Sequence, residues 1–256
     1  MQSSSDNLVI IPVLNERGTI ATVLENIRAH HTGDILAIDD GSTDGSEMIL
    51  DNTSGIQIIR HGNNLGYGKS LIDGFSFAIR CGYKLALTID CDEQHEPNLI
   101  PNMFAGIGDH DVLSGSRYLG SLNDDDTPPA DRYNINMIIT DIINEITRLC
   151  ITDSFCGFKC YRVSALARLS LDEPGFAQPL QFWIQAKRHG LKVAEIAVPR
   201  IYKNLNRSFG EKLDNPNTRV EYYLDVIVKE LERVKIPIPE HMVYIAKHKL
   251  GKVKLR

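Results

Sequence analysis

"LALTIDCDEQH" (residues 85–95) begins as an apolar strand and ends in a run of acidic and polar residues. Its apolar start predicts a buried β-strand at 84–90. Two carboxylates one residue apart, Asp90 and Asp92, follow where that strand stops, and they can meet in one small pocket once the chain turns. Carboxylate and amide oxygens suit hard divalent cations. We therefore expect Asp90, Asp92 and Gln94 to hold Mg²⁺ or Mn²⁺.

The rest of the chain alternates apolar strands with helical patterns. Further strands are predicted at 7–16, 33–46, 55–61, 110–117 and 191–199. Helices are predicted at 17–31, 45–52, 63–83, 132–151, 163–190 (in two pieces) and 218–234. Such alternation is typical of a mostly parallel sheet covered by helices on both faces. No composition break divides the chain, so we expect an α/β fold with one Rossmann-like domain at 1–235 and a basic tail at 236–256.

Acidic residues stand at the ends of three of these strands, at Glu16, Asp40 and Asp90. Because ligands bind such sheets beyond the carboxyl ends of the strands, we expect these side chains to lie side by side along one edge. Glu16 and Asp40 could accept hydrogen bonds from a base or a ribose. The glycine loop "NNLGYGKS" (63–70) would bring backbone amides and Lys69 to a phosphate. Its lone G-x-G, placed after the third strand, does not fit a dinucleotide-binding fingerprint.

Composition and charge exclude several classes of protein. The net charge of −5 gives no basis for nucleic-acid binding, and no apolar run approaches the ~20 residues that cross a bilayer. Residues 200–256, however, carry 13 Lys/Arg against 7 Asp/Glu, and this basic segment could meet a phosphate or an anionic membrane surface. The 5 cysteines form no C-x-x-C pair, so we expect free thiols in a reducing compartment.

The long helix predicted at 132–151 has a broad, isoleucine-rich face. Packing into the core is the main interpretation of that face, and contact with lipid or a partner is the alternative. The polar, proline-bearing stretch before it, 120–132, is predicted to be a mobile loop.

Seven segments, in order along the chain, resemble the family 2 glycosyltransferases of the GT-A fold: "VIIPVLNE", "IDDGSTDGS", "NLGYGKS", "TIDCDEQH", "GSRY", "TDSFCGFKCYR" and "AEIAVP". The branch of dolichyl-phosphate mannosyltransferases and bacterial polyprenyl-phosphate glycosyltransferases is the most similar. This resemblance implies a nucleotide-diphosphate sugar donor of the GDP-mannose or UDP-glucose type, Mg²⁺ or Mn²⁺, and inversion at the anomeric carbon. It also implies a polyprenyl or dolichyl phosphate as the acceptor of the hexose.

The resemblance further implies a role for individual residues. Binding of the nucleotide sugar would fall to Pro12, Leu14, Glu16, Asp40, Lys69, Asp90, Cys91, Asp92, Arg207 and Lys212. The metal ligands would be Asp90, Asp92 and Gln94, the acceptor phosphate would face Arg117, Arg132 and Lys159, and catalytic roles would fall to Asp92, Arg117 and Asp153. A phosphate acceptor is already anionic and needs no base, whereas a hydroxyl acceptor does. Asp153 is the candidate base for that second case.

Departures from the usual family pattern leave other interpretations open. Cys156 and Lys159 stand where the acceptor loop of the family usually has Ser and Arg. The alternatives are the same donor chemistry onto a soluble hydroxyl, a D-x-D phosphatase, a nucleotidyltransferase, or a binding protein that has lost catalysis. Such a phosphatase would carry D-x-D on its first strand, and here the motif follows the fourth.

A lipid acceptor would require contact with a membrane. We expect a cytoplasmic protein that touches the inner face of the membrane peripherally, through the helix at 132–151 or through the basic tail. Uracil and guanine are both compatible with Glu16 and Asp40, and the sequence leaves the oligomeric state open.

Overall fold

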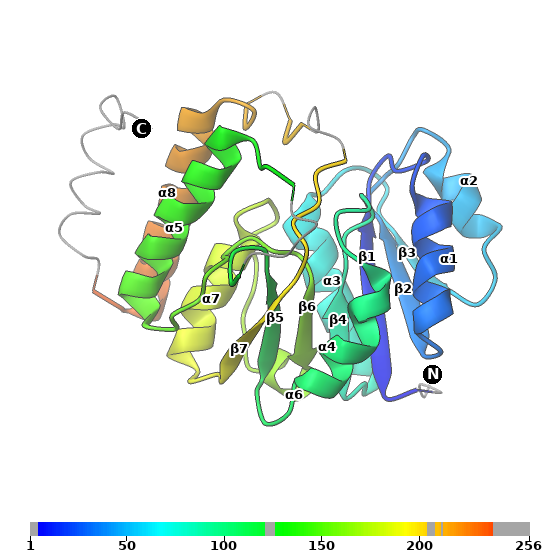
Figure 1. Ribbon diagram of the computed structural model, residues 1–256, viewed down its shortest axis with the longest axis horizontal. Helices are drawn as coiled ribbons and strands as arrows, with labels where there is room; N and C mark the ends of the chain where they lie inside the picture. Colours follow the sequence, from blue (N-terminus) through cyan, green and yellow to red (C-terminus); the bar gives the residue numbers. More distant parts are fainter. Residues whose placement is uncertain (1–4, 121–125, 204–207, 211, 238–256) are drawn as a thin grey trace.

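A single seven-stranded sheet forms the centre of the molecule, with strand order β3-β2-β1-β4-β6-β5-β7 (Figure 1). The computed structural model describes residues 5–120, 126–203, 208–210 and 212–237. The strands are β1 (Asn7–Val13), β2 (Asp34–Asp39), β3 (Gln57–Arg60), β4 (Leu85–Thr88), β5 (Val112–Ser116), β6 (Lys159–Arg162) and β7 (Val193–Ala197). β6 runs antiparallel to both of its neighbours, and the other strand pairs are parallel.

Helices cover both faces of this sheet. They are α1 (Ile20–His30), α2 (Ser46–Asp51), α3 (Tyr67–Cys81), α4 (Ile100–Gly106), α5 (Ala130–Thr147), α6 (Val163–Leu166), α7 (Gln178–Arg188) and α8 (Pro216–Val234), with a 3₁₀ turn η1 (Pro97–Leu99) before α4. Alternate residues of β1 supply the two cores. Leu8 and Ile10 pack with α3, α7 and α8, whereas Val9 and Ile11 pack with α1 and α4. The prediction of a mostly parallel sheet covered on both faces is confirmed.

The structure differs from the predicted elements in two places. No strand was predicted for residues 152–162, between the helices predicted at 132–151 and 163–190, but Lys159–Arg162 form β6, inserted between β4 and β5. β6 has only four residues, with a cationic side chain at each end, and this pattern is too short and too polar to predict a strand. It forms a strand because it pairs with β4 and β5 in the folded protein. The short helix α4, at Ile100–Gly106, was also not predicted.

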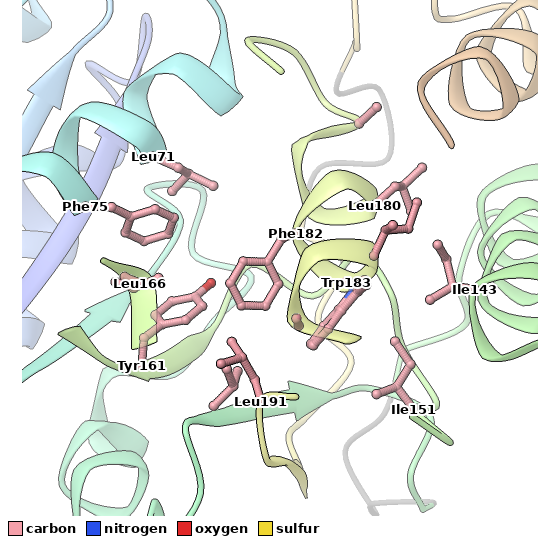
Figure 2. Close-up of a cluster of buried hydrophobic side chains, with 14 of the residues drawn as sticks. Leu71, Phe75, Ile143, Ile151, Tyr161, Leu166, Leu180, Phe182, Trp183 and Leu191 are labelled. Atoms are coloured by element: carbon pink, nitrogen blue, oxygen red, sulfur yellow. The ribbon is translucent and has the colours of Figure 1, made fainter. Parts of the chain in front are cut away.

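The isoleucine-rich face of α5 is buried in the core. Ile139 and Ile143 are fully buried, and α5 packs against α7 and α8. Figure 2 shows Ile143 facing Leu180 and Trp183 of α7 in this cluster. The main interpretation, core packing, is therefore confirmed, and the alternative of a lipid-facing α5 is wrong because that face is already covered by protein.

Some expectations lie partly or wholly outside the described residues. Positions 121–125 of the predicted mobile loop and positions 238–256 of the predicted basic tail belong to this group. In the described part of the chain, none of the helices has both the length and the apolar character needed to cross a membrane. All five cysteines are free thiols, as predicted.

Candidate active site

A cleft of about 590 Å³ opens above the carboxyl ends of β1, β2 and β4. Its wall includes the acidic groups of all three strand ends, Glu16, Asp40 and Asp90. These side chains are far apart in the sequence, and they meet because β2, β1 and β4 are adjacent parallel strands. The expected row of acidic strand ends along one edge of the sheet is confirmed.

The D-x-D segment has a defined geometry at the cleft floor. The Tyr67 hydroxyl donates to Asp90 Oδ1 at 2.8 Å, and the Asp90 backbone N–H donates to His95 Nδ1 at 3.2 Å. Gln94 N–H donates to Asp92 Oδ1 at 3.1 Å. Burial, and then the neighbouring Asp90 carboxylate, raises the pKa of Tyr67 well above its ordinary value, so this phenol remains a hydrogen-bond donor.

The donor atoms at this floor fit a divalent cation. Asp90, Asp92 and Gln94 all line the cleft, and they offer the hard oxygen ligands that Mg²⁺ and Mn²⁺ take. Among the described residues, no three His, Cys, Asp or Glu side chains gather closely enough to form a complete metal site. The protein thus offers a partial ligand set. This is the usual arrangement when substrate phosphates complete the coordination of Mg²⁺.

Gly157 allows Asp90 to hold this position. A β-carbon at residue 157 would lie 2.8 Å from Asp90 Cγ, closer than real side-chain contacts allow. The segment before β6 therefore approaches the D-x-D closely, and only glycine leaves room for the carboxylate.

We expect Gly157→Ala to push the Asp90 carboxylate out of place. Affinity for UDP or GDP in the presence of Mn²⁺ should fall about tenfold, the loss that about 1.4 kcal/mol of binding energy brings. Calorimetric titration measures it. Gly120→Ala is the matched control, because a β-carbon there meets nothing within 4 Å. Equal affinity of the two variants would show that Asp90 does not need this space.

Arg117, which lines another part of the cleft wall, forms an ion pair with the fully buried Asp153. Arg117 Nε lies 2.7 Å from Asp153 Oδ2 and Nη2 lies 2.9 Å from Oδ1, while Asn136 Nδ2 donates to Oδ1 at 2.8 Å. Arg117 and Asn136 line the cleft, but Asp153 is fully buried behind them. Burial raises the pKa of Asp153, but the Arg117 charge and the hydrogen bonds from Arg117 and Asn136 outweigh it and bring the value down to about 2.

This arrangement differs from the expectation that Asp153 acts as a base. A carboxylate with a pKa of about 2 takes up almost no proton near neutral pH. Its oxygens also accept hydrogen bonds from Arg117, Asn136 and the Phe155 backbone N–H. In this structure Asp153 holds the Arg117 guanidinium in place.

Three described lysines that were expected near the substrates are not found on the cleft wall. Lys159 is buried, donates to the Cys156 carbonyl and lies 5.5 Å from the Trp183 ring. Lys69 pairs with Asp73 at 2.5 Å. Lys212 is exposed and does not line the cleft. Arg207 lies outside the described residues. Burial lowers the pKa of Lys159, which lies in the core and does not line the cleft.

Other cleft residues were missed from the sequence. Arg132 and Arg219 flank the ring of Phe209, with guanidinium carbons 5.0 and 4.6 Å from its centroid. Arg132 was expected there, but Arg219 and Phe209 were not. Arg219 is buried on α8 and pairs with Asp131 at 2.6 Å. The sequence did hold a signal for Arg219, because it is a charged residue on the apolar face of the amphipathic helix α8.

Comparison with known proteins identifies the chain. Residues 8–170 match the model of glycosyl transferase family 2. The undecaprenyl-phosphate mannosyltransferase of Micrococcus luteus is 25% identical over 211 residues, covering 78% of this chain and 86% of that protein. The UDP-N-acetylglucosamine–dolichyl-phosphate N-acetylglucosaminyltransferase of Methanococcus voltae is 27% identical over 228 residues, covering 80% and 90%.

A solved structure shares the fold. The glucosyl-3-phosphoglycerate synthase of Mycobacterium tuberculosis, crystallised with Mn²⁺, UDP-glucose and phosphoglyceric acid, superposes with a TM-score of 0.69 at 18% identity, covering 92% of this chain and 81% of that one. The sheet and its helices have the GT-A fold of the glycosyltransferases. The chain belongs to glycosyl transferase family 2. The family, the fold and the enzyme class predicted from the seven segments are confirmed.

Proposed function

We propose that the protein transfers a hexose, with inversion, from a nucleotide-diphosphate sugar to a polyprenyl or dolichyl phosphate. The single observation that carries this proposal is the division of the cleft into two chemically different walls. One wall has the acidic strand ends, and the other has Arg117 and Arg132 among aromatic side chains. The relatives named above, from Micrococcus luteus and Methanococcus voltae, support a lipid-phosphate acceptor.

The acidic wall would bind the donor. Pro12, Leu14, Glu16 and Asp40 line its nucleoside end, and Cys91 lines the floor between the two carboxylates of the D-x-D. Asp90, Asp92 and Gln94 would hold Mg²⁺ or Mn²⁺, which would stabilise the negative charge that develops on the departing diphosphate. A GDP-mannose or UDP-glucose type of donor fits this wall, since either base offers an N–H to a carboxylate.

The opposite wall would bind the acceptor. Arg117, fixed by Asp153, and Arg132 present guanidinium groups suited to a phosphate. Tyr118, Phe155, Phe176, Tyr202, Phe209 and Tyr223 give this wall an aromatic surface that suits an isoprenoid chain. The acceptor oxygen is already anionic, so the residues of the chain need only place it in line with the anomeric carbon.

A soluble hydroxyl acceptor is the second candidate, and the structure favours it less. Such an acceptor needs a base to remove its proton. Among the described residues that line the acceptor wall none is Asp, Glu or His, and Asp153 lies behind the wall with its pKa lowered to about 2.

A donor and acceptor panel tests the proposal. UDP- and GDP-hexoses are incubated with Mn²⁺ and undecaprenyl phosphate, dolichyl phosphate or the corresponding lipid alcohol. We expect a glycosyl phospholipid from one donor and no product from the alcohol. Transfer to the alcohol alone would establish the hydroxyl candidate, and metal-dependent release of phosphate from small phosphomonoesters without nucleotide binding would establish a phosphatase.

We also propose that the protein acts at the cytoplasmic face of a membrane. The sequence offered two segments for contact with the membrane, the helix at 132–151 and the basic tail at 236–256. The apolar face of α5 is buried in the core, so the basic tail is the segment that we propose makes this contact. At low salt, the full chain should sediment with vesicles that contain anionic lipid. With neutral vesicles at the same salt concentration it should remain in the supernatant. Equal behaviour with the two kinds of vesicle would contradict an electrostatic contact.

A further inference from the structure

Four polar side chains form a chain of contacts behind the end of the cleft proposed to bind the nucleoside. Lys69 Nζ lies 2.5 Å from Asp73 Oδ1, and Asp73 Oδ2 lies 2.9 Å from His61 Nε2. His61 Nδ1 lies 2.6 Å from Asp40 Oδ1. Of the four, only Asp40 lines the cleft. His61 is buried, so its interactions are with protein groups and not with bulk water.

A carboxylate contacts each nitrogen of the His61 ring. An ionised carboxylate only accepts hydrogen bonds, and a neutral imidazole donates from only one of its nitrogens. Both ring nitrogens of His61 lie within hydrogen-bond distance of a carboxylate oxygen, on Asp40 and on Asp73. An imidazolium, with a proton on each nitrogen, satisfies both contacts at once. With His61 as an imidazolium, positive Lys69, negative Asp73, positive His61 and negative Asp40 would follow one another, and the net charge of the four side chains would be zero.

Asp40 links this chain to the cleft wall. Besides His61, it accepts backbone N–H groups of the glycine loop, from Leu65 at Oδ1 and from Gly66 at Oδ2, both at 2.8 Å. The turn after β2 packs tightly on the same loop. Gly41 has a φ of +79°, and a β-carbon there would lie 2.6 Å from the carbonyl carbon of Asn63. The position of the Asp40 carboxylate therefore sets the position of the loop that forms this wall.

We infer that His61 is a positioning residue for the nucleotide: as an imidazolium between Asp40 and Asp73 it fixes the Asp40 carboxylate and the glycine loop. The inference rests on the proposed function, because it assigns a role within the proposed donor site. It has an electrostatic consequence as well. Glu16, Asp40, Asp90 and Asp92 all face a ligand that carries two phosphates, and the imidazolium neutralises one of these four carboxylates from behind.

Lys69 acquires a different role from the one expected from the sequence. Its ammonium group lies against Asp73, outside the cleft, so it acts on the nucleotide through Asp73, His61 and Asp40. A lysine that touches the diphosphate strengthens the binding of a diphosphate only. A lysine that acts through Asp40 strengthens the binding of a nucleoside monophosphate and of a diphosphate by the same factor.

The first test replaces His61 by glutamine in the full chain. Calorimetry with Mn²⁺ and UDP or GDP should show affinity about tenfold weaker, the loss expected for a charge-assisted hydrogen bond. The KM of the lipid phosphate should stay within about twofold, a separation that general unfolding would not give. His31→Gln is the matched control: His31 is equally buried, its Nε2 lies 3.2 Å from the Asp34 carbonyl oxygen, and it is far from the cleft lining.

Two further measurements do not depend on the stability of that variant. Nitrogen NMR of the wild-type protein at neutral pH should show both His61 ring nitrogens protonated. Lys69 is half-exposed. The Lys69→Met variant should lose affinity for the nucleoside monophosphate and for the diphosphate by the same factor, whether the pair is UMP and UDP or GMP and GDP. One unprotonated ring nitrogen, or unchanged nucleotide affinity in His61→Gln, overturns the inference. Loss of diphosphate affinity alone in Lys69→Met overturns the role given to Lys69.

These outcomes separate the inference from the proposed function. If the wild-type protein binds neither UDP nor GDP with Mn²⁺, the proposed donor site is wrong and the inference falls with it. If the wild type binds one of them and His61→Gln binds it equally well, the proposed function stands and the inference alone is wrong.

Discussion

We expect Asp92→Ala to abolish metal-dependent donor binding and to lower turnover by on the order of a thousandfold, since a bound divalent ion would contribute several kcal/mol to stabilising developing charge. Asp92 lines the cleft, and its Oδ1 accepts the Gln94 backbone N–H, which orients the carboxylate. Removing it leaves Asp90, already bonded to Tyr67, and the amide of Gln94 as the remaining ligands. Calorimetry with UDP or GDP, with and without Mn²⁺, and rates at saturating donor measure the two effects.

Glu93→Asn is the matched control for this experiment. Glu93 is the neighbouring acid, but it pairs with Lys203 at 3.4 Å and does not line the cleft. Its φ is +58°, a left-handed conformation that asparagine tolerates better than alanine. We expect nearly unchanged donor affinity in this variant. Wild-type turnover of Asp92→Ala at saturating donor would show that the ion is held elsewhere.

Asp153→Ala should have the second largest effect, on stability and on the acceptor together. The variant removes hydrogen bonds between charged groups, and because the Arg117 guanidinium lines the cleft and can still be solvated, the cost is about 1.5–3 kcal/mol of unfolding free energy. Because Arg117 then loses its fixed orientation, the KM of the lipid phosphate should rise about tenfold or more, while nucleotide affinity stays nearly constant. Denaturant unfolding and steady-state kinetics measure the two quantities.

Two variants separate positioning from base catalysis. Asp153→Asn keeps an oxygen that accepts from Arg117, so it should raise the acceptor KM with little loss of kcat. A base would instead lose kcat at every acceptor concentration. Arg117→Ala should leave donor affinity nearly intact and weaken the acceptor step, and combining it with Asp153→Asn should add little, since both act through one guanidinium. Full additivity would contradict this coupling.

The pH dependence of stability gives an independent check on Asp153. Its pKa in the folded protein is about 2, below the ordinary 3.8, so the ionised form is favoured by folding. The resulting stabilisation, about 2 kcal/mol from this shift, is complete above about pH 4 and is lost as the pH falls toward 2. Asp153→Asn should remove that part of the acid dependence. If the free energy of unfolding of this variant fell between about pH 4 and pH 2 as much as that of the wild type, folding would not favour the ionised form of Asp153.

The local pattern of the sequence predicted the acidic side of the cleft well. Strand ends carry their polar groups to the same edge whenever the strands are adjacent and parallel, so Glu16, Asp40 and Asp90 could be placed together from the pattern alone. The metal interpretation of Asp90, Asp92 and Gln94 remains a prediction, and it fits the oxygen atoms that the structure gathers there.

The cations were predicted less well, for a physical reason. A lysine has a long, flexible side chain, and its sequence position does not say which acid or carbonyl it will reach. Lys69 turns to Asp73, and Lys159 turns into the core toward the Cys156 carbonyl. Arg219 enters the cleft from α8, at the far end of the chain from the motifs that define the family.

The sequence by itself determined most of the strands and helices, the acidic edge of the sheet and the family, because these follow from short-range periodicity and from residues next to one another in the chain. Only the tertiary structure decided that β6 inserts antiparallel, that Asp153 lies buried behind Arg117, and that His61 bridges two acids. Those features depend on contacts between residues that lie 12 to 77 positions apart in the sequence, and their charge and burial are set only when the chain folds around them.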